Sequence, residues 1–154
     1  IENEGFNIIS ANYFLEKSFS PKGHFAGPKP FSTFQKEINR GYEVLKSLSK
    51  SDVGQSVVIQ NGLILAVEAI EGTDEMIKRA GKLKFSGLGP ILVKAPKINQ
   101  DMRFDQPVIG EQTIENAYKS GFSGIACKHK NVLIINLEKV IKLAEKRQIT
   151  LFGF

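Results

Sequence analysis

An Asn-Gly pair at positions 61 and 62, placed between two apolar segments, constrains the fold of this chain more than any other feature. Residues 55–60 and 63–70 have the length and the aliphatic composition of strands. Asn-Gly readily takes the positive φ values that a two-residue hairpin turn requires. The sequence therefore predicts an antiparallel hairpin. Because side chains alternate along a strand, Glu68 falls on an otherwise apolar face and needs a partner there.

Helical and strand-like segments mix along the rest of the chain. Phe34, Ile38 and Leu45 recur at helical spacing and predict a helix over residues 31–50. The other predicted helices cover residues 11–19, 73–84 and 110–120, and a last one follows residue 136. The other predicted strands cover residues 6–10, 91–95, 149–152, and the pair 123–128 and 132–135 around a turn. This mixture predicts the α/β class, with a mixed sheet flanked by helices.

Residues 20–30 contain three prolines and two glycines. That density is unfavourable for both helix and strand, and it predicts a linker or a long loop. The chain begins with Ile1 rather than with Met. We therefore expect that a preceding part of the protein is absent.

The chain carries 21 lysines and arginines against 16 aspartates and glutamates, a net charge of +5. This charge favours anionic partners, namely phosphate esters, nucleic acid or an acidic lipid surface. The single cysteine, Cys127, excludes a disulfide framework and a cysteine-based zinc site. Gly87-Leu88-Gly89 precedes a predicted strand and lacks the Gly-Lys-Ser/Thr ending of a P-loop. No apolar run approaches the roughly 20 residues of a membrane span.

Basic and acidic side chains gather where the predicted strands end, between residues 66 and 110. Open α/β sheets bind ligands at the ends of their strands. Lys94, Lys97 and Arg103 offer the positive charge that a diphosphate needs, and the planar guanidinium of Arg103 can grip two phosphate oxygens. Asp101 and Asp105 flank that arginine and suit Mg²⁺, which takes one or two carboxylates besides water and phosphate.

A second acidic group consists of Glu68, Glu71 and Asp74. One of these carboxylates can orient or deprotonate an attacking water. Carboxylates for a metal, combined with cations for phosphate, are typical of phosphoryl transfer. A plainer interpretation stays open, because acidic residues are common at helix starts for electrostatic reasons alone. Arg103 and its flanking aspartates can equally form a solvated loop whose ion pair contributes only about 0–1 kcal/mol.

Several motifs, in matching order and spacing, resemble the carboxy-terminal domain of the LpxI-type UDP-2,3-diacylglucosamine pyrophosphatases. The strongest are Val-Glu-Ala-Ile-Glu-Gly-Thr-Asp at residues 67–74 and Gln-Asp-Met-Arg-Phe-Asp at residues 100–105. Leu-Val-Lys at residues 92–94, together with Lys97 and Thr113, adds to them.

The resemblance implies an enzyme of lipid A synthesis that uses Mg²⁺ to hydrolyse UDP-2,3-diacylglucosamine to UMP and 2,3-diacylglucosamine 1-phosphate. The implied catalytic residues are Glu68, Glu71, Asp101 and Asp105, of which Asp101 and Asp105 also hold the metal. The implied substrate-binding residues are Thr73, Asp74, Lys94, Lys97, Gln100, Arg103 and Thr113. Which carboxylate is the base and which binds the metal stays open.

The resemblance also implies a two-domain protein that holds its substrate between the domains. Residues 1–28 would be the tail and linker of a largely absent amino-terminal domain, and residues 29–154 the catalytic domain. We expect a cytoplasmic enzyme, peripheral to the inner membrane, with its absent domain as a partner. Whether it forms a homodimer, and whether the isolated chain is active, stays open.

Two other functions are compatible with the composition. A nucleic-acid-binding module is suggested by the positive charge, but the lysines lack the interleaved aromatic residues of a stacking surface. We therefore expect no nucleic-acid partner. A non-catalytic domain that binds a phosphorylated metabolite would use the same charged residues without turnover.

Overall fold

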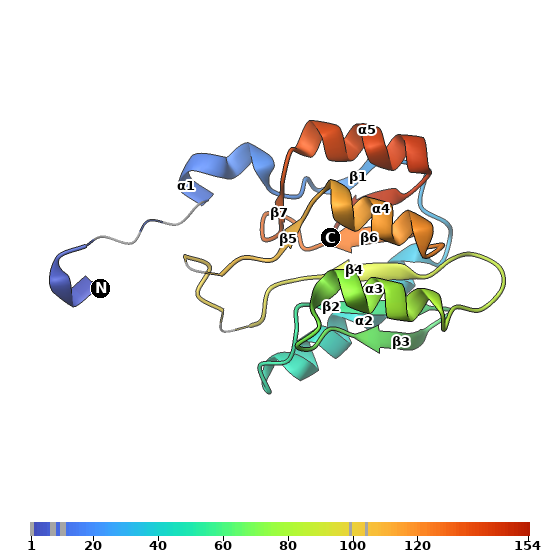
Figure 1. Ribbon diagram of the computed structural model, residues 1–154, viewed down its shortest axis with the longest axis horizontal. Helices are drawn as coiled ribbons and strands as arrows, with labels where there is room; N and C mark the ends of the chain where they lie inside the picture. The colour runs from blue at the N-terminus through green and yellow to red at the C-terminus, as the bar shows by residue number, and fades with distance from the viewer. Residues whose placement is uncertain (1, 7–8, 10–11, 99, 104) are drawn as a thin grey trace.

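A six-stranded mixed sheet forms the centre of the fold (Figure 1). The computed structural model describes residues 2–6, 9, 12–98, 100–103 and 105–154. Strands β4, β6 and β8 are parallel, and antiparallel strands extend the sheet at both edges. In order across the sheet, the strands are β1 (Gly23–Ala26), β8 (Thr150–Gly153), β6 (Gly124–Cys127), β4 (Ile91–Lys94), β2 (Ser56–Gln60) and β3 (Leu63–Val67).

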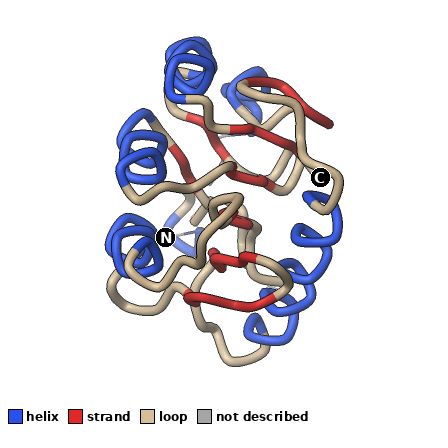
Figure 2. The backbone as a smooth tube through the Cα atoms, turned by 90° about the vertical axis from the view of Figure 1, so that its right-hand side faces the viewer, coloured by secondary structure: helices blue, strands red, loops and turns tan. Residues whose placement is uncertain are grey.

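Helices cover both faces of this sheet. Helix α2 (Phe34–Ser49) packs on one face, against β2 and β4. Helices α3 (Gly72–Gly81), α4 (Glu111–Lys119) and α5 (Leu137–Arg147) lie side by side on the other face. Figure 2 shows the sheet between these two helical layers. The predicted α/β class, with a mixed sheet flanked by helices, is confirmed.

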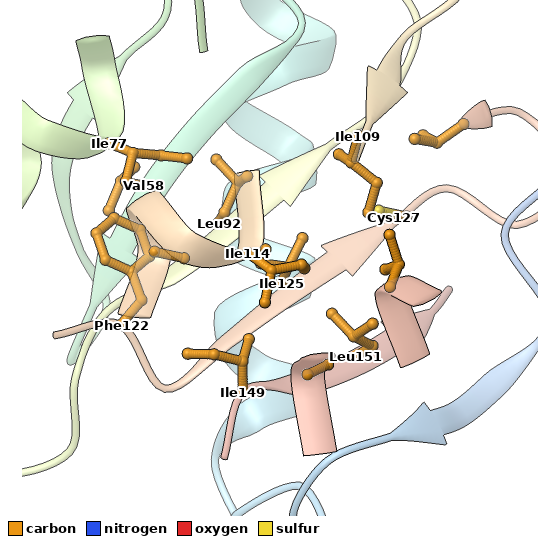
Figure 3. Packing of buried hydrophobic residues seen from close by; sticks show 14 of the residues in the cluster. Val58, Ile77, Leu92, Ile109, Ile114, Phe122, Ile125, Cys127, Ile149 and Leu151 are labelled. Atoms are coloured by element: carbon orange, nitrogen blue, oxygen red, sulfur yellow. The ribbon is translucent and has the colours of Figure 1, made fainter. Parts of the chain in front are cut away.

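The alternation of side chains along the strands divides the apolar interior into two clusters. Val57 and Ile59 of β2 pack against α2, whereas Val58 between them belongs to the cluster beneath the other three helices. Fully burying an aliphatic side chain of this kind contributes roughly 1.5–3 kcal/mol. In the cluster beneath α3, α4 and α5, side chains from strands and helices meet (Figure 3), among them Ile77, Leu92, Ile114 and Ile125.

The hairpin predicted from Asn61 and Gly62 is confirmed. Both residues have positive φ, 53° and 77°, and Gln60 pairs with Leu63 directly beside the turn. The hairpin places β3 at the sheet edge and ends just before Glu68. It therefore delivers that carboxylate to the end of the sheet where β4 also ends.

The other predicted helices are present, with ends shifted by a few residues. The segment 11–19 contains the short helix α1 (Asn12–Leu15) and a 3₁₀ turn, Glu16–Ser18, and another 3₁₀ turn covers Glu2–Glu4. Of the predicted strand 6–10, residues 7, 8 and 10 lie outside the described residues. Within the described ranges, no helix is long and apolar enough to cross a membrane.

The prediction that residues 20–30 form neither helix nor strand is wrong. Gly23–Ala26 forms β1, which pairs antiparallel with β8 as the outermost strand of the sheet. The three prolines lie outside these four residues, and an edge strand hydrogen-bonds to a neighbour on one side only. A short strand is therefore compatible with a segment rich in proline and glycine.

The two strands predicted on either side of residues 128–131 are present, but they belong to different sheets. β6 pairs with β4 and β8 in the large sheet. The following strand, β7 (Leu133–Ile134), pairs instead with β5 (Val108–Ile109) in a separate two-stranded sheet. Both strands exist, but the turn between them leads from one sheet to the other.

Candidate active site

The end of β4, the beginning of β2 and the beginning of α3 meet at one end of the large sheet. Ser56 of β2 pairs with Lys94 of β4, and both lie within hydrogen-bonding reach of Thr73 in the first turn of α3. Parallel strands end here and a helix begins here, which is the usual setting of a ligand site in an open α/β sheet.

Lys94 is buried, with 3% of its surface exposed. Its Nζ donates to Thr73 Oγ1 at 2.7 Å and to Ser56 Oγ at 3.0 Å, and it lies 3.8 Å from Glu68 Oε2. Burial lowers the pKa of Lys94, because the charged amine loses its hydration, while the nearby carboxylate of Glu68 raises it in part. The amine of Lys94 therefore lies beneath the protein surface with a pKa below that of an exposed lysine.

Glu68 supplies the carboxylate of this buried group. Its Oε1 accepts a hydrogen bond from Thr73 Oγ1 at 2.8 Å, and its Oε2 accepts one from the backbone N–H of Gln55 at 3.2 Å. Gly54 permits this approach. Its φ is +50°, and a Cβ on it would collide with the backbone carbonyl of Glu68. The partner that the sequence required for Glu68 is therefore a set of hydrogen-bond donors and one lysine.

Asp105 is joined to the same group through Gln55. The side-chain amide of Gln55 donates to Asp105 Oδ2 at 3.2 Å, while its backbone N–H binds Glu68. Gln100 also donates to Asp105 Oδ2, at 2.6 Å. The structure thus brings together five residues that the sequence selected, Glu68, Thr73, Lys94, Gln100 and Asp105, and it adds Gln55 as the link.

Asp101 and Arg103 form an exposed pair with each other. Arg103 Nη2 lies 2.8 Å from Asp101 Oδ2, and Arg103 Nε lies 3.1 Å from both carboxylate oxygens. The guanidinium lowers the pKa of Asp101. Asp101 is tied to Asp105 through the backbone, where the N–H of Asp105 donates to its carbonyl. Phe104, in the same motif, lies outside the described residues.

Glu71 lies apart from the Glu68 network. Its carboxylate pairs with Arg79 of the same helix region and accepts a hydrogen bond from the backbone N–H of Ala69. The hydrogen bond from Arg79 lowers the pKa of Glu71. A carboxylate stabilised in this way is a weaker base, and its contacts fix the turn that enters α3.

Lys97 lines a pocket of about 450 Å³ together with Gln55 and Glu68. Its Nζ pairs with Asp52 Oδ1 at 2.6 Å, and its backbone N–H donates to Gln100. We refer to this cavity as the site pocket. Ile70, whose side chain is fully exposed, stands on its rim.

Thr73, Asp74 and Thr113 line a second hollow of about 340 Å³. Thr113 is 7% exposed and accepts a weak hydrogen bond from the backbone N–H of Gly110 at the start of α4. Thr73 therefore connects the second hollow to the site pocket, because its hydroxyl donates to Glu68, which lines that pocket.

The carboxylate oxygens of Asp101 and Asp105 are ligands that a hard divalent cation such as Mg²⁺ prefers, although the two residues do not form a preformed binding cage. Across the described ranges, no cluster of three or more His, Cys, Asp or Glu side chains could hold a metal. Mg²⁺ needs only one or two carboxylates when water and phosphate supply the rest. Both oxygens of Asp101 face Arg103, whereas the hydrogen bonds that Asp105 accepts from Gln55 and Gln100 fall on Oδ2. Asp105 is thus the better placed of the two.

Sequence reasoning missed two members of the network, Gln55 and Ser56. Neither is charged, and both lie in a segment that reads as an ordinary strand. The signal that could have found Ser56 is its position on β2, because strand pairing sets it directly opposite Lys94.

The chain matches the family model described as the LpxI C-terminal domain over residues 21–152. It is 34% identical, over 158 aligned positions, to UDP-2,3-diacylglucosamine pyrophosphatase LpxI of Caulobacter vibrioides. This match covers 99% of the chain and 56% of the relative, so the chain spans little more than half of the relative's length. The chain belongs to the LpxI family and corresponds to the C-terminal domain of its members.

Proposed function

We propose that this chain is the catalytic domain of a UDP-2,3-diacylglucosamine pyrophosphatase, which releases UMP and 2,3-diacylglucosamine 1-phosphate in lipid A synthesis. The observation that carries the proposal is the network of Glu68, Thr73, Lys94 and, through Gln55, Asp105 beside the site pocket. Separate segments of the chain contribute these groups. The similarity to a pyrophosphatase named for this substrate supports the same reaction.

Lys97 and Arg103 supply the positive charge for the diphosphate. Their side chains are 22% and 43% exposed, and each is paired with an exposed carboxylate that a phosphate can replace or share. The guanidinium suits a bidentate contact with two phosphate oxygens. Gln100, which binds Asp105, and Asp74 and Thr113, which line the second hollow, complete the proposed substrate contacts.

Lys94 has a different part in this proposal. Because its Nζ is buried and already donates to Thr73 and Ser56, it acts as a positioning residue. It holds the Thr73 hydroxyl against Glu68 and partly offsets the negative charge of that carboxylate beside the pocket.

A divalent cation, Mg²⁺, is part of the proposal. Asp105 would hold it, with Asp101 as a second carboxylate once Arg103 turns to the substrate. When bound, such a cation neutralises phosphate oxygens and makes the phosphorus a better electrophile. Glu68 would orient the attacking water, because it borders the site pocket and two donors fix its carboxylate. Glu71 would act less directly, since its carboxylate is engaged by Arg79 and Ala69.

We place the enzyme in the cytoplasm, at the surface of the inner membrane. The reason is chemical, because the proposed substrate joins a nucleotide made in water to two acyl chains that reside in a bilayer. Peripheral contact is sufficient for such a substrate, provided that one surface of the protein meets the lipid.

The proposal is tested by incubating the protein at its natural full length, and the 154-residue chain alone, with UDP-2,3-diacylglucosamine and Mg²⁺. We expect UMP and 2,3-diacylglucosamine 1-phosphate in equal amounts from the full-length protein, and a loss of both products with EDTA. Tight binding of UMP without any turnover would instead indicate a non-catalytic domain that binds a phosphorylated metabolite. Turnover that is unaffected by EDTA would show that the reaction needs no divalent cation.

A further inference from the structure

The loop between α3 and β4, residues 82–90, combines lysines with outward-facing apolar side chains. Its sequence is Lys-Leu-Lys-Phe-Ser-Gly-Leu-Gly-Pro. Leu83, Phe85 and Leu88 are 51%, 48% and 58% exposed. In Figure 1 this loop projects beyond the body of the fold at its right-hand end. A single exposed apolar side chain is ordinary and needs no explanation. Three large ones on the same projecting loop form a patch, and such patches mark interaction sites.

The loop is held in this conformation by a buried glutamine of the neighbouring strand. Gln60, which is 2% exposed, donates to the carbonyls of Phe85 and Leu88 at 3.0 and 2.7 Å, and it accepts the N–H of Phe85 at 2.8 Å. Ser123 anchors the far end by donating to the carbonyl of Gly89 at 2.6 Å. The apolar side chains therefore point outward from a fixed backbone, and little ordering remains to be done on binding.

Lysines surround the same loop. Lys78, Lys82, Lys84 and Lys119 line a hollow of about 450 Å³ at the ends of α3 and α4, and no acidic side chain is among its described lining residues. Lys78 pairs with Glu75, whereas Lys82, Lys84 and Lys119 form no ion pair within the described part of the chain. The surface thus combines concentrated positive charge with apolar tips.

We propose that this surface docks onto a bilayer of anionic phospholipid, with Leu83, Phe85 and Leu88 entering the interface and the lysines meeting the phosphates. We call the surface formed by residues 82–90, Lys78 and Lys119 the lysine loop surface. An interfacial membrane contact needs apolar side chains that leave water, beside cations that stay with the headgroups. Nucleic acid would use the lysines but offers no apolar phase for the two leucines, so the bilayer explains both halves of the surface.

The lysine loop surface lies at the opposite end of β4 from the candidate active site. The loop leads into Ile91, where the strand begins, whereas Lys94 stands where it ends. The inference rests on the proposed membrane location and names a surface that would hold the chain on the bilayer, separate from the surface that opens the site pocket. Vesicle binding requires no hydrolysis, so each proposal can fail while the other stands.

The test uses the 154-residue chain and vesicles of phosphatidylethanolamine with about one quarter phosphatidylglycerol, against vesicles of phosphatidylcholine alone. We expect cosedimentation with the anionic vesicles only, weakened by salt because charge contributes. Lys82→Glu/Lys84→Glu and Phe85→Ser/Leu88→Ser are each expected to weaken binding roughly tenfold or more. The control, Lys139→Glu/Lys142→Glu, makes the same change of charge at exposed positions on α5 and is expected to lose much less.

A fluorescence measurement makes the test independent of these double variants. The chain contains no tryptophan, so Phe85→Trp introduces a single reporter at the loop tip. We expect its emission to shift to the blue on anionic vesicles and to stay unchanged on phosphatidylcholine. No shift, equal binding to both kinds of vesicle, or equal losses in the α5 control would overturn the proposal. Binding to duplex DNA without binding to vesicles would overturn it in favour of a nucleic-acid surface.

Discussion

Lys94 Nζ donates a hydrogen bond to Thr73 Oγ1 at 2.7 Å, and the same hydroxyl donates onward to Glu68 at 2.8 Å. The direct distance from Lys94 Nζ to Glu68 is 3.8 Å. One hydroxyl therefore mediates between a buried amine and a carboxylate. This arrangement makes Thr73 the residue on which the geometry of the network depends.

Thr73→Val keeps the shape of the side chain and removes the hydroxyl. Because the buried amine loses an acceptor and Glu68 loses a donor, we expect the free energy of unfolding to fall by about 1–3 kcal/mol. Urea denaturation of the chain measures this change. Thr73→Ser retains the hydroxyl and should recover much of the loss. An equal loss in both variants would mean that packing of the methyl group is what matters.

The amine of Lys94 should titrate below its ordinary pKa of 10.5, because burial disfavours its charged form. The Glu68 carboxylate opposes that shift, so Glu68→Gln is expected to lower the pKa of Lys94 further. Carbon-13 NMR of the lysine Cε measures both values. Glu138→Gln, at an exposed position on α5, should leave the pKa unchanged, and an upward shift in Glu68→Gln would contradict the electrostatic account.

The Glu71 carboxyl should titrate below its ordinary pKa of 4.5, because Arg79 donates to its charged form. Arg79→Gln is expected to move the pKa back towards 4.5, as measured by carbon-13 NMR of the carboxyl. A carboxyl whose pKa is lower in the folded state stabilises the fold above its unfolded pKa and loses that effect as pH falls. The difference in stability between the chain and Glu71→Gln should therefore be present at neutral pH and disappear in acid.

Gln60 should control the order of residues 82–90. Gln60→Leu removes the partners of the Phe85 N–H and of two carbonyls, so we expect faster amide hydrogen exchange at Phe85 and a stability loss of roughly 1–3 kcal/mol. The change should be confined to this loop and the adjoining end of β2. Unchanged exchange at Phe85 would show that the loop is held by other contacts.

Local sequence signals predicted most of the fold. Asn61 and Gly62 specify a turn by their own backbone preferences, and the apolar spacing around Ile38 specifies one face of α2. The strand Gly23–Ala26 could not be predicted in this way. It forms because β8, more than 120 residues later, offers its edge, and no local pattern records that partner.

The charged members of the candidate site could be predicted from the sequence, but its neutral members Gln55 and Ser56 and the pairing of the side chains could not. Glu68 was recognisable because a carboxylate on an apolar strand face requires compensation. Its link to Asp105 runs through Gln55, whose amide carries no charge and gives no distinctive signal. The pairing of Lys97 with Asp52 likewise joins positions 45 residues apart, which spacing cannot reveal.

The central claim is that Asp105 and the Glu68 network belong to one catalytic site. The most direct measurement is the rate of UMP release from UDP-2,3-diacylglucosamine by the full-length protein carrying Asp105→Asn, with Glu138→Gln as the control. We expect Asp105→Asn to lower kcat by roughly a hundredfold or more, because it removes a carboxylate while keeping the shape of the side chain, and the control to retain its full rate. Full retention of kcat in Asp105→Asn would contradict the account.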